Sequence, residues 1–405
     1  MHIQRDLEEA VDTLIGCDGF EAAGVAAGIK KKHALDLGMI FAPHCATAAA
    51  VFTRNRVQAA PVVISMSRLA SGRTRAVIVN SGNANCCTGN RGLADAHSMT
   101  EATAMALGID VDDVCVASTG VIGARLPIEK IRSAIPAAAK KLAPHGFEDF
   151  ARAIMTTDTV PKLVQCKGVI DEREFTLLAA AKGAGMIRPD MATLLCFICT
   201  DAEIEPLLLR RTLRSAVDCS LNRISIDGDT STNDMVLVMA SGKSGARVQS
   251  PDQIKQFEHA LRDLLMDLSR QLVRDGEGVN KVVRIEVCGA RSDAAALQVA
   301  DTVAHSPLVK TAFFGEDANW GRIIAAVGRS GIPVDPERVD LYFDDVLMFS
   351  NGQGCGVEAE ELSTAVLMQP EFCVRIDLNH GPGRAALLTC DFSVEYVRIN
   401  ADYRS

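Results

Sequence analysis

The sequence predicts a mixed α/β protein. Apolar residues make up 48% of the 405 residues but aromatic residues only 4%, so the cores must be built mainly from Ala, Val, Ile and Leu. The 31 glycines and the single Trp also favour an α/β class. A chain of this length has material for two or three domains with ample cores.

Composition also narrows the function. The net charge of −9 argues against a nucleic-acid surface. The N-terminus has no basic stretch followed by an apolar one, and no window reaches 18 apolar residues, so secretion and a membrane span are not expected. The 13 cysteines are odd in number and lack metal spacing, which indicates reduced thiols in a cytoplasmic protein and no metal site. Cys196 and Cys199 should point to opposite faces of one strand.

The first third of the chain shows strands and one clear helix. Residues 17–65 are expected to form short strands with tight turns, including 61–66. A strand at 76–79 leads into the Gly/Asn-rich loop 80–89 and a helix over 93–107. This loop lacks the Lys-Ser/Thr of a phosphate-binding loop, so a pocket wall or a structural loop is favoured over an anion site.

A second short strand follows and ends at Ser118-Thr119-Gly120. The segment 127–139 is expected to be helical, with a break near Pro136. Thr119 and Gly120 together could offer a hydroxyl and an unobstructed backbone N–H to one point, which is what an oxyanion hole requires. An ordinary Ser-Thr-Gly turn is the alternative.

The stretch 182–201 organises the chain. A hairpin expected at 165–170 and 174–179 leads into a Gly-containing approach. The apolar run 194–199 then predicts a buried strand. Thr193 stands where loop becomes strand, so it is either the entrance of a core strand or a hydroxyl aimed out of the end of a sheet.

In the second half, a helix over 206–221 precedes the polar loop 225–234, whose aspartates lack the spacing of a calcium loop. Ser250-Pro251 starts the clearest helix, which ends at Asp275. Glu277, between two glycines, is expected to be an exposed turn residue. Further strands are expected at 235–239, 282–287, 339–343, 373–378 and 385–389, and a further helix ends at Val327.

Several blocks, in order along nearly the whole chain from Gly19 to Ser405, resemble the ornithine acetyltransferase (glutamate N-acetyltransferase) family of arginine biosynthesis. They are Asn80-Ser-Gly-Asn-Ala-Asn, Ser118-Thr-Gly-Val-Ile-Gly, Lys182-Gly-Ala-Gly-Met-Ile with Met191-Ala-Thr-Leu-Leu, Asn319-Trp-Gly-Arg and the segment Tyr396 to Tyr403. The resemblance implies a two-lobed, layered α/β architecture of the self-processing N-terminal-nucleophile type, as in ornithine acetyltransferases and related aminopeptidases. The site would lie between the lobes.

The resemblance implies that the chain cuts itself between Ala192 and Thr193. Residues 1–192 would form an α chain with the oxyanion hole, and residues 193–405 a β chain that starts at the nucleophile. The two chains would interleave in both lobes. A Thr hydroxyl needs a base, and cleavage supplies one in the new α-amine, whose reference pKa is about 7.7–8.0.

The same resemblance implies roles for particular residues. Thr119 and Gly120 match the oxyanion pair. The substrate-binding positions match Thr156, Lys182, Thr193, Glu277, Asn400 and Ser405. This chain has Val279-Asn280 where the family usually has Ala-Thr, Leu388 where it often has Trp, and Ser405 where it usually has Thr.

The implied activity is ping-pong acetyl transfer from N²-acetylornithine to glutamate through acetyl-Thr193. No cofactor is implied, and acetyl-CoA stays open as a second donor. The implied assembly is a heterotetramer of two α and two β chains. The alternatives are an N-terminal-nucleophile aminopeptidase or amidohydrolase with water as acceptor, and a non-catalytic binding protein of the same fold.

Overall fold

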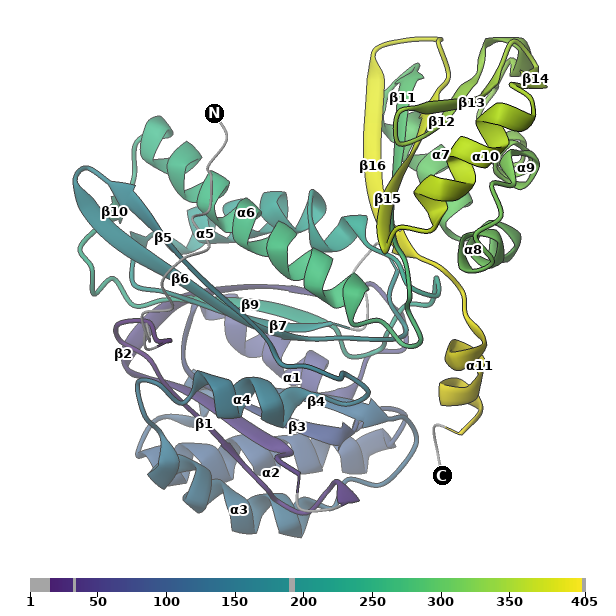
Figure 1. Ribbon diagram of the computed structural model, residues 1–405. Coiled ribbons are helices and arrows are strands. Elements are labelled where there is room, and N and C mark those ends of the chain that lie inside the picture. Colours follow the sequence, from purple (N-terminus) through teal and green to yellow (C-terminus); the bar gives the residue numbers. More distant parts are fainter. Residues whose placement is uncertain (1–14, 32–33, 189–193, 403–405) are drawn as a thin grey trace.

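The computed structural model describes residues 15–31, 34–188 and 194–402. It has two α/β lobes and a C-terminal helix that returns to the first lobe (Figure 1), so the predicted α/β class is confirmed. The elements of the first lobe are β1 (Glu21–Val25), β2 (Leu37–Phe52), α1 (Ala60–Arg68), β3 (Arg73–Asn83), α2 (Gly89–Leu107), β4 (Val114–Val121), α3 (Ile128–Lys141), α4 (Phe147–Ile154), β5 (Lys162–Ile170), β6 (Arg173–Lys182), β7 (Leu195–Thr200), β8 (Glu203–Ile204), α5 (Pro206–Asp218), β9 (Met235–Ala240), β10 (Arg247–Val248) and α6 (Pro251–Arg274).

The first lobe is built on an eight-stranded sheet that the long strand β2 divides into two halves. The strand order is β4-β3-β2-β9-β7-β6-β5, with β1 beside β2. The first part of β2 pairs with β3, its register shifts between Phe41 and Ala46, and its last part pairs with β9. Side chains from both halves and from α4 share one core, in which the rings of Phe150 and Phe197 meet edge to face at 5.4 Å.

Helices cover the outer faces of the two halves. α5 and α6 pack on the half that contains β5, β6, β7 and β9, whereas α1, α2 and α3 pack on β3 and β4. Strand β7 is therefore buried on both faces, as its unbroken apolar run predicts. Cys196 lies in the core under α5 and α6 and Cys199 in the core with α4, which confirms the expectation of opposite faces.

Two local expectations were wrong. Residues 61–66 belong to helix α1, which has Pro61 in its first turn and in which Val62 and Ile64 are buried. Helix α3 continues through Pro136 without a break. Pro136 and Arg132, the residue whose carbonyl loses its helical partner, are both exposed, so water can replace the missing hydrogen bond.

Other elements formed as predicted. Ser250 caps α6 in a reciprocal capping box with Gln253. β5 and β6 form the expected hairpin, whose turn residues Asp171 and Glu172 both have positive φ. These two elements matter for the site, because β6 ends at Lys182 and α6 ends just before Glu277.

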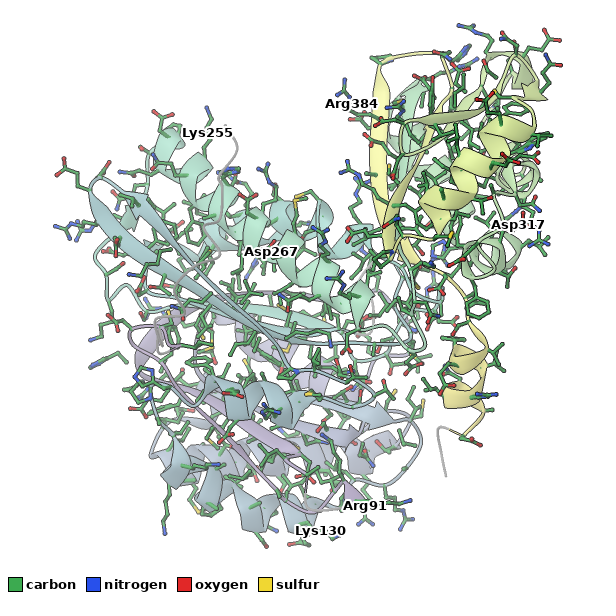
Figure 2. The ribbon with its side chains drawn as sticks, viewed as in Figure 1. Arg91, Lys130, Lys255, Asp267, Asp317 and Arg384 are labelled. Atoms are coloured by element: carbon green, nitrogen blue, oxygen red, sulfur yellow. The ribbon has the colours of Figure 1, made fainter. Side chains whose placement is uncertain are left out.

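The second lobe has a six-stranded sheet in the order β14-β13-β12-β15-β11-β16, with an apolar core shared with its helices. Charged side chains such as Lys255 of the first lobe and Arg384 of the second lie exposed on the outside (Figure 2). The remaining elements are β11 (Val282–Ala290), α7 (Asp293–Ala304), α8 (Pro307–Phe314), α9 (Trp320–Gly328), β12 (Asp340–Phe343), β13 (Val346–Ser350), β14 (Gln353–Gly354), α10 (Val357–Leu367), β15 (Glu371–Asp377), β16 (Gly383–Cys390) and α11 (Val394–Ala401).

Candidate active site

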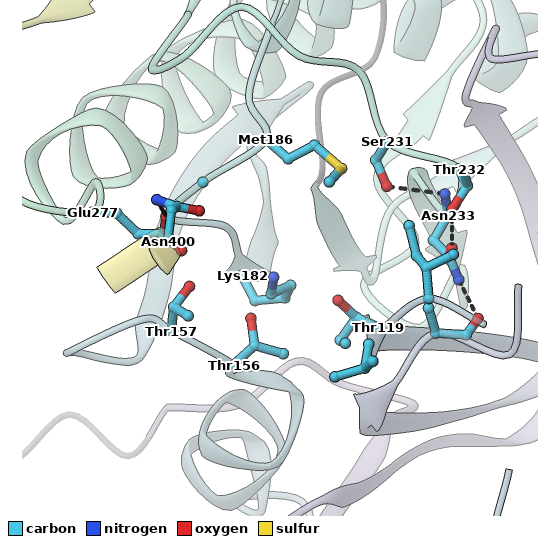
Figure 3. Close-up of a pocket in the computed structure, with 15 residues that line it drawn as sticks. Thr119, Thr156, Thr157, Lys182, Met186, Ser231, Thr232, Asn233, Glu277 and Asn400 are labelled. Atoms are coloured by element: carbon cyan, nitrogen blue, oxygen red, sulfur yellow. Dashed lines mark hydrogen bonds between the residues drawn. The ribbon is translucent and has the colours of Figure 1, made fainter. Parts of the chain in front are cut away.

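A pocket of about 240 Å³ lies at one end of the strands of the large sheet. The carboxyl ends of β4 and β6 meet there with the loop before β9, the turn after α6 and helix α11 (Figure 3). The pocket collects six of the residues predicted for the site: Thr119, Gly120, Thr156, Lys182, Glu277 and Asn400. The other predicted residues, Ala192, Thr193 and Ser405, lie outside the described residues.

The end of β4 is fixed by close backbone packing. Gly120 has φ +131°, and a Cβ on it would lie 2.3 Å from the backbone carbonyl carbon of Gly82 in β3. Only glycine fits there without a clash. Gly120 has no side chain that could cover its backbone N–H. This N–H is next to the Thr119 hydroxyl in the sequence.

Asn233 ties this strand end to its neighbour. Its Nδ2 donates to the carbonyl of Ser118 at 2.8 Å and to the carbonyl of Ala84 at 2.7 Å. Ser118 Oγ also donates to Asn80 Oδ1 at 2.6 Å. These buried hydrogen bonds hold the ends of β3 and β4 in a fixed relation, so Thr119 and Gly120 are positioned before any ligand binds.

The pocket contains charges of opposite sign. The amine of Lys182 lies amid the ring of lining side chains in Figure 3, and the carboxylate of Glu277 lies on the side near Asn400. Burial lowers the pKa of Lys182, and Asp158 opposes that shift. A zwitterionic molecule with a carboxylate and an ammonium group would find a partner for each.

Glu277 is not the exposed turn residue that the flanking glycines suggested. It is 8% exposed, its backbone N–H donates to the carbonyl of Ala184 at 2.8 Å, and Asn400 Nδ2 donates to Oε2 at 2.8 Å. The carboxylate lies so close to Gly185 that a Cβ there would be 2.5 Å from Oε2. Helix α11 and the approach segment therefore hold Glu277 from two sides.

The polar loop 225–234 forms a further wall of the pocket through Ser231, Thr232 and Asn233. Its aspartates accept hydrogen bonds from the backbone. Asp227 accepts from the N–H groups of Met186 and Ile187 at 2.5 and 3.0 Å. Among the described residues, no group of three or more His, Cys, Asp or Glu side chains is arranged to hold a metal ion.

Asp234 binds the backbone of Leu194 at the entrance of β7. Its Oδ1 accepts from the N–H of Leu194 at 3.0 Å. Asp234 is 1% exposed, and burial raises its pKa well above the ordinary value for a carboxyl group. A buried carboxyl group thus anchors the residue that follows Thr193 in the sequence.

The sequence matches a known protein family over most of its length. The model of the ArgJ family matches residues 21–405. The chain belongs to the ArgJ family. A relative from Geobacter sulfurreducens, named arginine biosynthesis bifunctional protein ArgJ, is 50% identical over 96% of this chain and 99% of its own. One of the same name from Syntrophotalea carbinolica is 49% identical over 97% of this chain and 100% of its own.

A solved structure of arginine biosynthesis bifunctional protein argJ from Bacillus halodurans is also similar. It is 40% identical, covers 51% of this chain and 97% of its own, and has a TM-score of 0.49. The sequence relatives span almost the full length of both chains, so ArgJ family membership applies to the whole chain.

One expectation for the site of this chain was wrong, namely that it lies between the lobes. Every lining residue except Asn400 precedes β11, the first strand of the second lobe. The second lobe affects the pocket only indirectly, because its last strand leads to α11, which carries Asn400. The hydroxyl of Tyr396 on α11 donates to Asp227 at 3.2 Å, which attaches the helix to the first lobe.

Sequence reasoning missed three buried charged residues behind the pocket: Asp158, Lys162 and Asp275. Asp275 was interpreted only as the end of a helix. Lys162 had a signal, because a lysine beside an apolar strand is costly to bury unless it is paired. The sequence did not indicate the partner, since Lys162 and Asp275 are 113 residues apart.

Proposed function

We propose that this protein is an ornithine acetyltransferase of arginine biosynthesis, which transfers the acetyl group of N²-acetylornithine to glutamate. Family membership supports the reaction class. The observation that carries the proposal to this chain is the pocket itself. It combines a Thr–Gly pair, a buried lysine and a buried glutamate in a cavity of about 240 Å³, a size suited to an amino acid.

The reaction would begin with cleavage between Ala192 and Thr193, which frees the α-amine of Thr193. The Thr193 hydroxyl then attacks the acetyl carbonyl carbon while its α-amine takes the proton. The C–N bond breaks as the resulting ammonium returns that proton to the leaving amine of ornithine. An acetyl ester on Thr193 and free ornithine result.

The second half reverses these roles. The neutral amine of glutamate attacks the ester carbonyl, the C–O bond to Thr193 breaks, and the proton of the new amide nitrogen passes through the α-amine to the Thr193 oxygen. Both steps pass through a tetrahedral oxyanion. The Thr119 hydroxyl and the Gly120 N–H would donate hydrogen bonds to it, in a place that is built before the substrate arrives.

Lys182 would bind a substrate carboxylate and Glu277 the side-chain ammonium of ornithine. Thr156, Asn400 and Ser405 would complete the contacts. Holding both ends of the substrate fixes the carbonyl between nucleophile and oxyanion donors, which raises the effective concentration of the reacting groups.

After cleavage the two pieces would stay together. Strand β6, from the first piece, pairs with β7 of the second along six residue pairs from Leu177↔Thr200 to Lys182↔Leu195, and β2 pairs with β9. We extend the proposal to an assembly of two α and two β chains. All 13 cysteines are free thiols, which fits a cytoplasmic location. Among the described residues, none of the helices is both long and apolar enough to span a membrane.

The test is acetyl exchange by purified protein with labelled acetylornithine and glutamate. Labelled N-acetylglutamate with parallel double-reciprocal lines supports the proposal. Intersecting lines would replace the acetyl-Thr193 intermediate with direct transfer. Acetate release that is indifferent to glutamate would indicate a hydrolase, and no turnover a binding protein. Replacing acetylornithine by acetyl-CoA in the same assay decides whether the chain uses both donors.

A further inference from the structure

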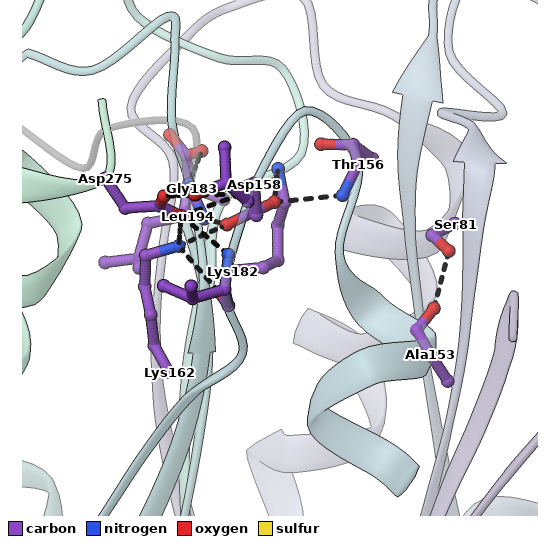
Figure 4. A network of polar contacts seen from close by, with 12 residues as sticks. Ser81, Ala153, Thr156, Asp158, Lys162, Lys182, Gly183, Leu194 and Asp275 are labelled. Atoms are coloured by element: carbon purple, nitrogen blue, oxygen red, sulfur yellow. Dashed lines mark hydrogen bonds and ion pairs between the residues drawn. The ribbon is translucent and has the colours of Figure 1, made fainter. Parts of the chain in front are cut away.

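A buried network of charges lies next to the pocket, in contact with the lining residues Thr156 and Lys182 (Figure 4). The amine of Lys162, which is 0% exposed, is 2.7 Å from Asp158 Oδ1 and 2.5 Å from Asp275 Oδ2. Asp158 and Asp275 are themselves almost fully buried as side chains. None of these three residues lines the pocket. Charges removed from water at this cost are kept where they are paired and hydrogen-bonded.

Asp158 connects this network to several parts of the pocket. Its Oδ2 accepts from the N–H of Thr156 at 2.9 Å and lies 4.0 Å from the amine of Lys182. Its Oδ1 accepts from the N–H of Gly183 at 2.7 Å. One carboxylate thus contacts the Thr156 loop, the end of β6 and the amine that faces the cavity.

Asp275 connects the network to the opposite wall. It is the residue directly after α6, two positions before Glu277, and it accepts from the N–H of Thr159 at 3.0 Å. Lys162 therefore joins the segment that carries Thr156 to the turn that carries Glu277. One buried lysine thus connects the two segments that lead to the charged pocket residues.

The field at Lys182 has contributions of both signs. Asp158 lies 4.0 Å from the amine of Lys182, and it favours the charged amine against the cost of burial. Neighbouring Lys162 disfavours it. Although burial alone would raise the pKa of Asp158, Lys182 and Lys162 hold it well below its usual range, so Asp158 is ionised. The charged groups that act on Lys182 are Asp158, Lys162, Glu277, Asp234 and Lys30.

We propose that Asp158 is a positioning residue that keeps Lys182 charged and in place for the substrate carboxylate, while Lys162 limits that effect and fixes Asp158. This rests on the proposed function, in which Lys182 binds a carboxylate. The consequence is an upper pH limit to substrate binding that the network sets. Removing Asp158 should lower this limit, whereas removing Lys162 should raise it.

The experiment measures the KM for acetylornithine from neutral to alkaline pH in wild type, Asp158→Asn and Lys162→Met. Above its limit, KM rises tenfold per pH unit as Lys182 loses its proton. We expect the rise to begin on the order of one pH unit lower in Asp158→Asn, which is about a tenfold higher KM at a fixed alkaline pH. In Lys162→Met the rise in KM should begin at a higher pH than in wild type.

Two controls separate this role from packing. The carboxamide analogue of acetylornithine lacks the carboxylate, so its KM should show no such displacement between variants. Asp149→Asn removes a carboxylate from the exposed ion pair with Lys141 and should leave the profile unchanged. If a single variant does not fold, the double variant Asp158→Asn/Lys162→Met removes the pair together. Its limit should lie below that of wild type, because Asp158 has the larger effect of the two on Lys182.

The proposal is supported if the pH limit moves down in Asp158→Asn and up in Lys162→Met. Displacements of the same sign, or profiles that match wild type in an enzyme that still exchanges acetyl groups, would overturn it. A double variant whose limit equals or exceeds that of wild type would overturn it too. A wild type without acetyl exchange would instead refute the proposed function.

Discussion

Thr119 and Gly120 are two neighbouring residues that the structure constrains in different ways. Gly120 is dictated by the backbone, since its Cβ would collide with β3. Thr119 is 3% exposed and lines the cavity, and the fold itself would accept a smaller residue there. Thr119 is therefore the better position for testing chemistry without disturbing the strand.

Thr119→Ala should fold and should lower kcat roughly 10²–10³-fold, or about 2.7–4 kcal/mol, because one donor to the oxyanion is lost. KM should change little, since the charge exists only in the transition state. Thr119→Ser retains a hydroxyl and should recover most of the rate. Steady-state kinetics of the three proteins measures this, and an unchanged kcat in Thr119→Ala would leave Thr119 as a turn residue.

Asp234 allows a prediction of how the stability of the protein changes with pH. Its pKa is raised in the folded protein, so folding holds its proton more tightly than the unfolded chain does. This contribution to stability is complete below the unfolded value of about 3.9 and declines as pH rises towards the folded value. Asp234→Asn can still accept from Leu194 and does not titrate.

The melting temperature of Asp234→Asn relative to wild type should therefore increase between about pH 4 and pH 7. Thermal unfolding of both proteins across this range provides the measurement. A difference that is constant with pH, or that falls, would show that the carboxyl group is ionised without penalty in the folded protein.

At the scale of elements, helix α11 is the part of the site that follows the second lobe in the sequence. Asn400 holds the carboxylate of Glu277, and Tyr396 holds Asp227. The ring of Tyr396 also packs on Phe392, with centroids 4.6 Å apart. The helix has no fully buried residue, so these few contacts determine where it lies.

Asn400→Ala should raise the KM for acetylornithine on the order of tenfold, because a hydrogen bond to a charged group is worth about 1.5–3 kcal/mol. The maximal rate should change less. Val397→Ala, on the same helix at a residue that is 58% exposed, is the matched control. Equal effects of both substitutions would show that the helix acts only by its presence.

The sequence predicts elements where a local signal agrees with the fold. The apolar run of β7 and the Ser-Pro start of α6 are such signals, and both elements formed as expected. Helix α1 was missed because its β-branched residues resemble a strand, while burial of one face determines the helix. Helix α3 passes through Pro136 because solvent, which a sequence pattern does not reveal, satisfies the freed carbonyl.

At the scale of the whole molecule, the resemblance predicted which residues would share a pocket, and six of them do. The sequence did not indicate that the pocket belongs to the first lobe or that charges lie behind it. Those features depend on contacts between residues that are distant in sequence, such as Lys162 and Asp275. Such contacts arise only when the layers assemble.

The central claim is that the chain works through an acetyl group on a freed Thr193. The most direct measurement is the intact mass of purified protein under denaturing conditions. We expect two pieces, the second starting at Thr193. That piece should gain one acetyl group with acetylornithine alone and lose it when glutamate is added, and Thr193→Ala should remain one chain. An uncut wild type that is fully active, or cleavage that persists in Thr193→Ala, would contradict the account.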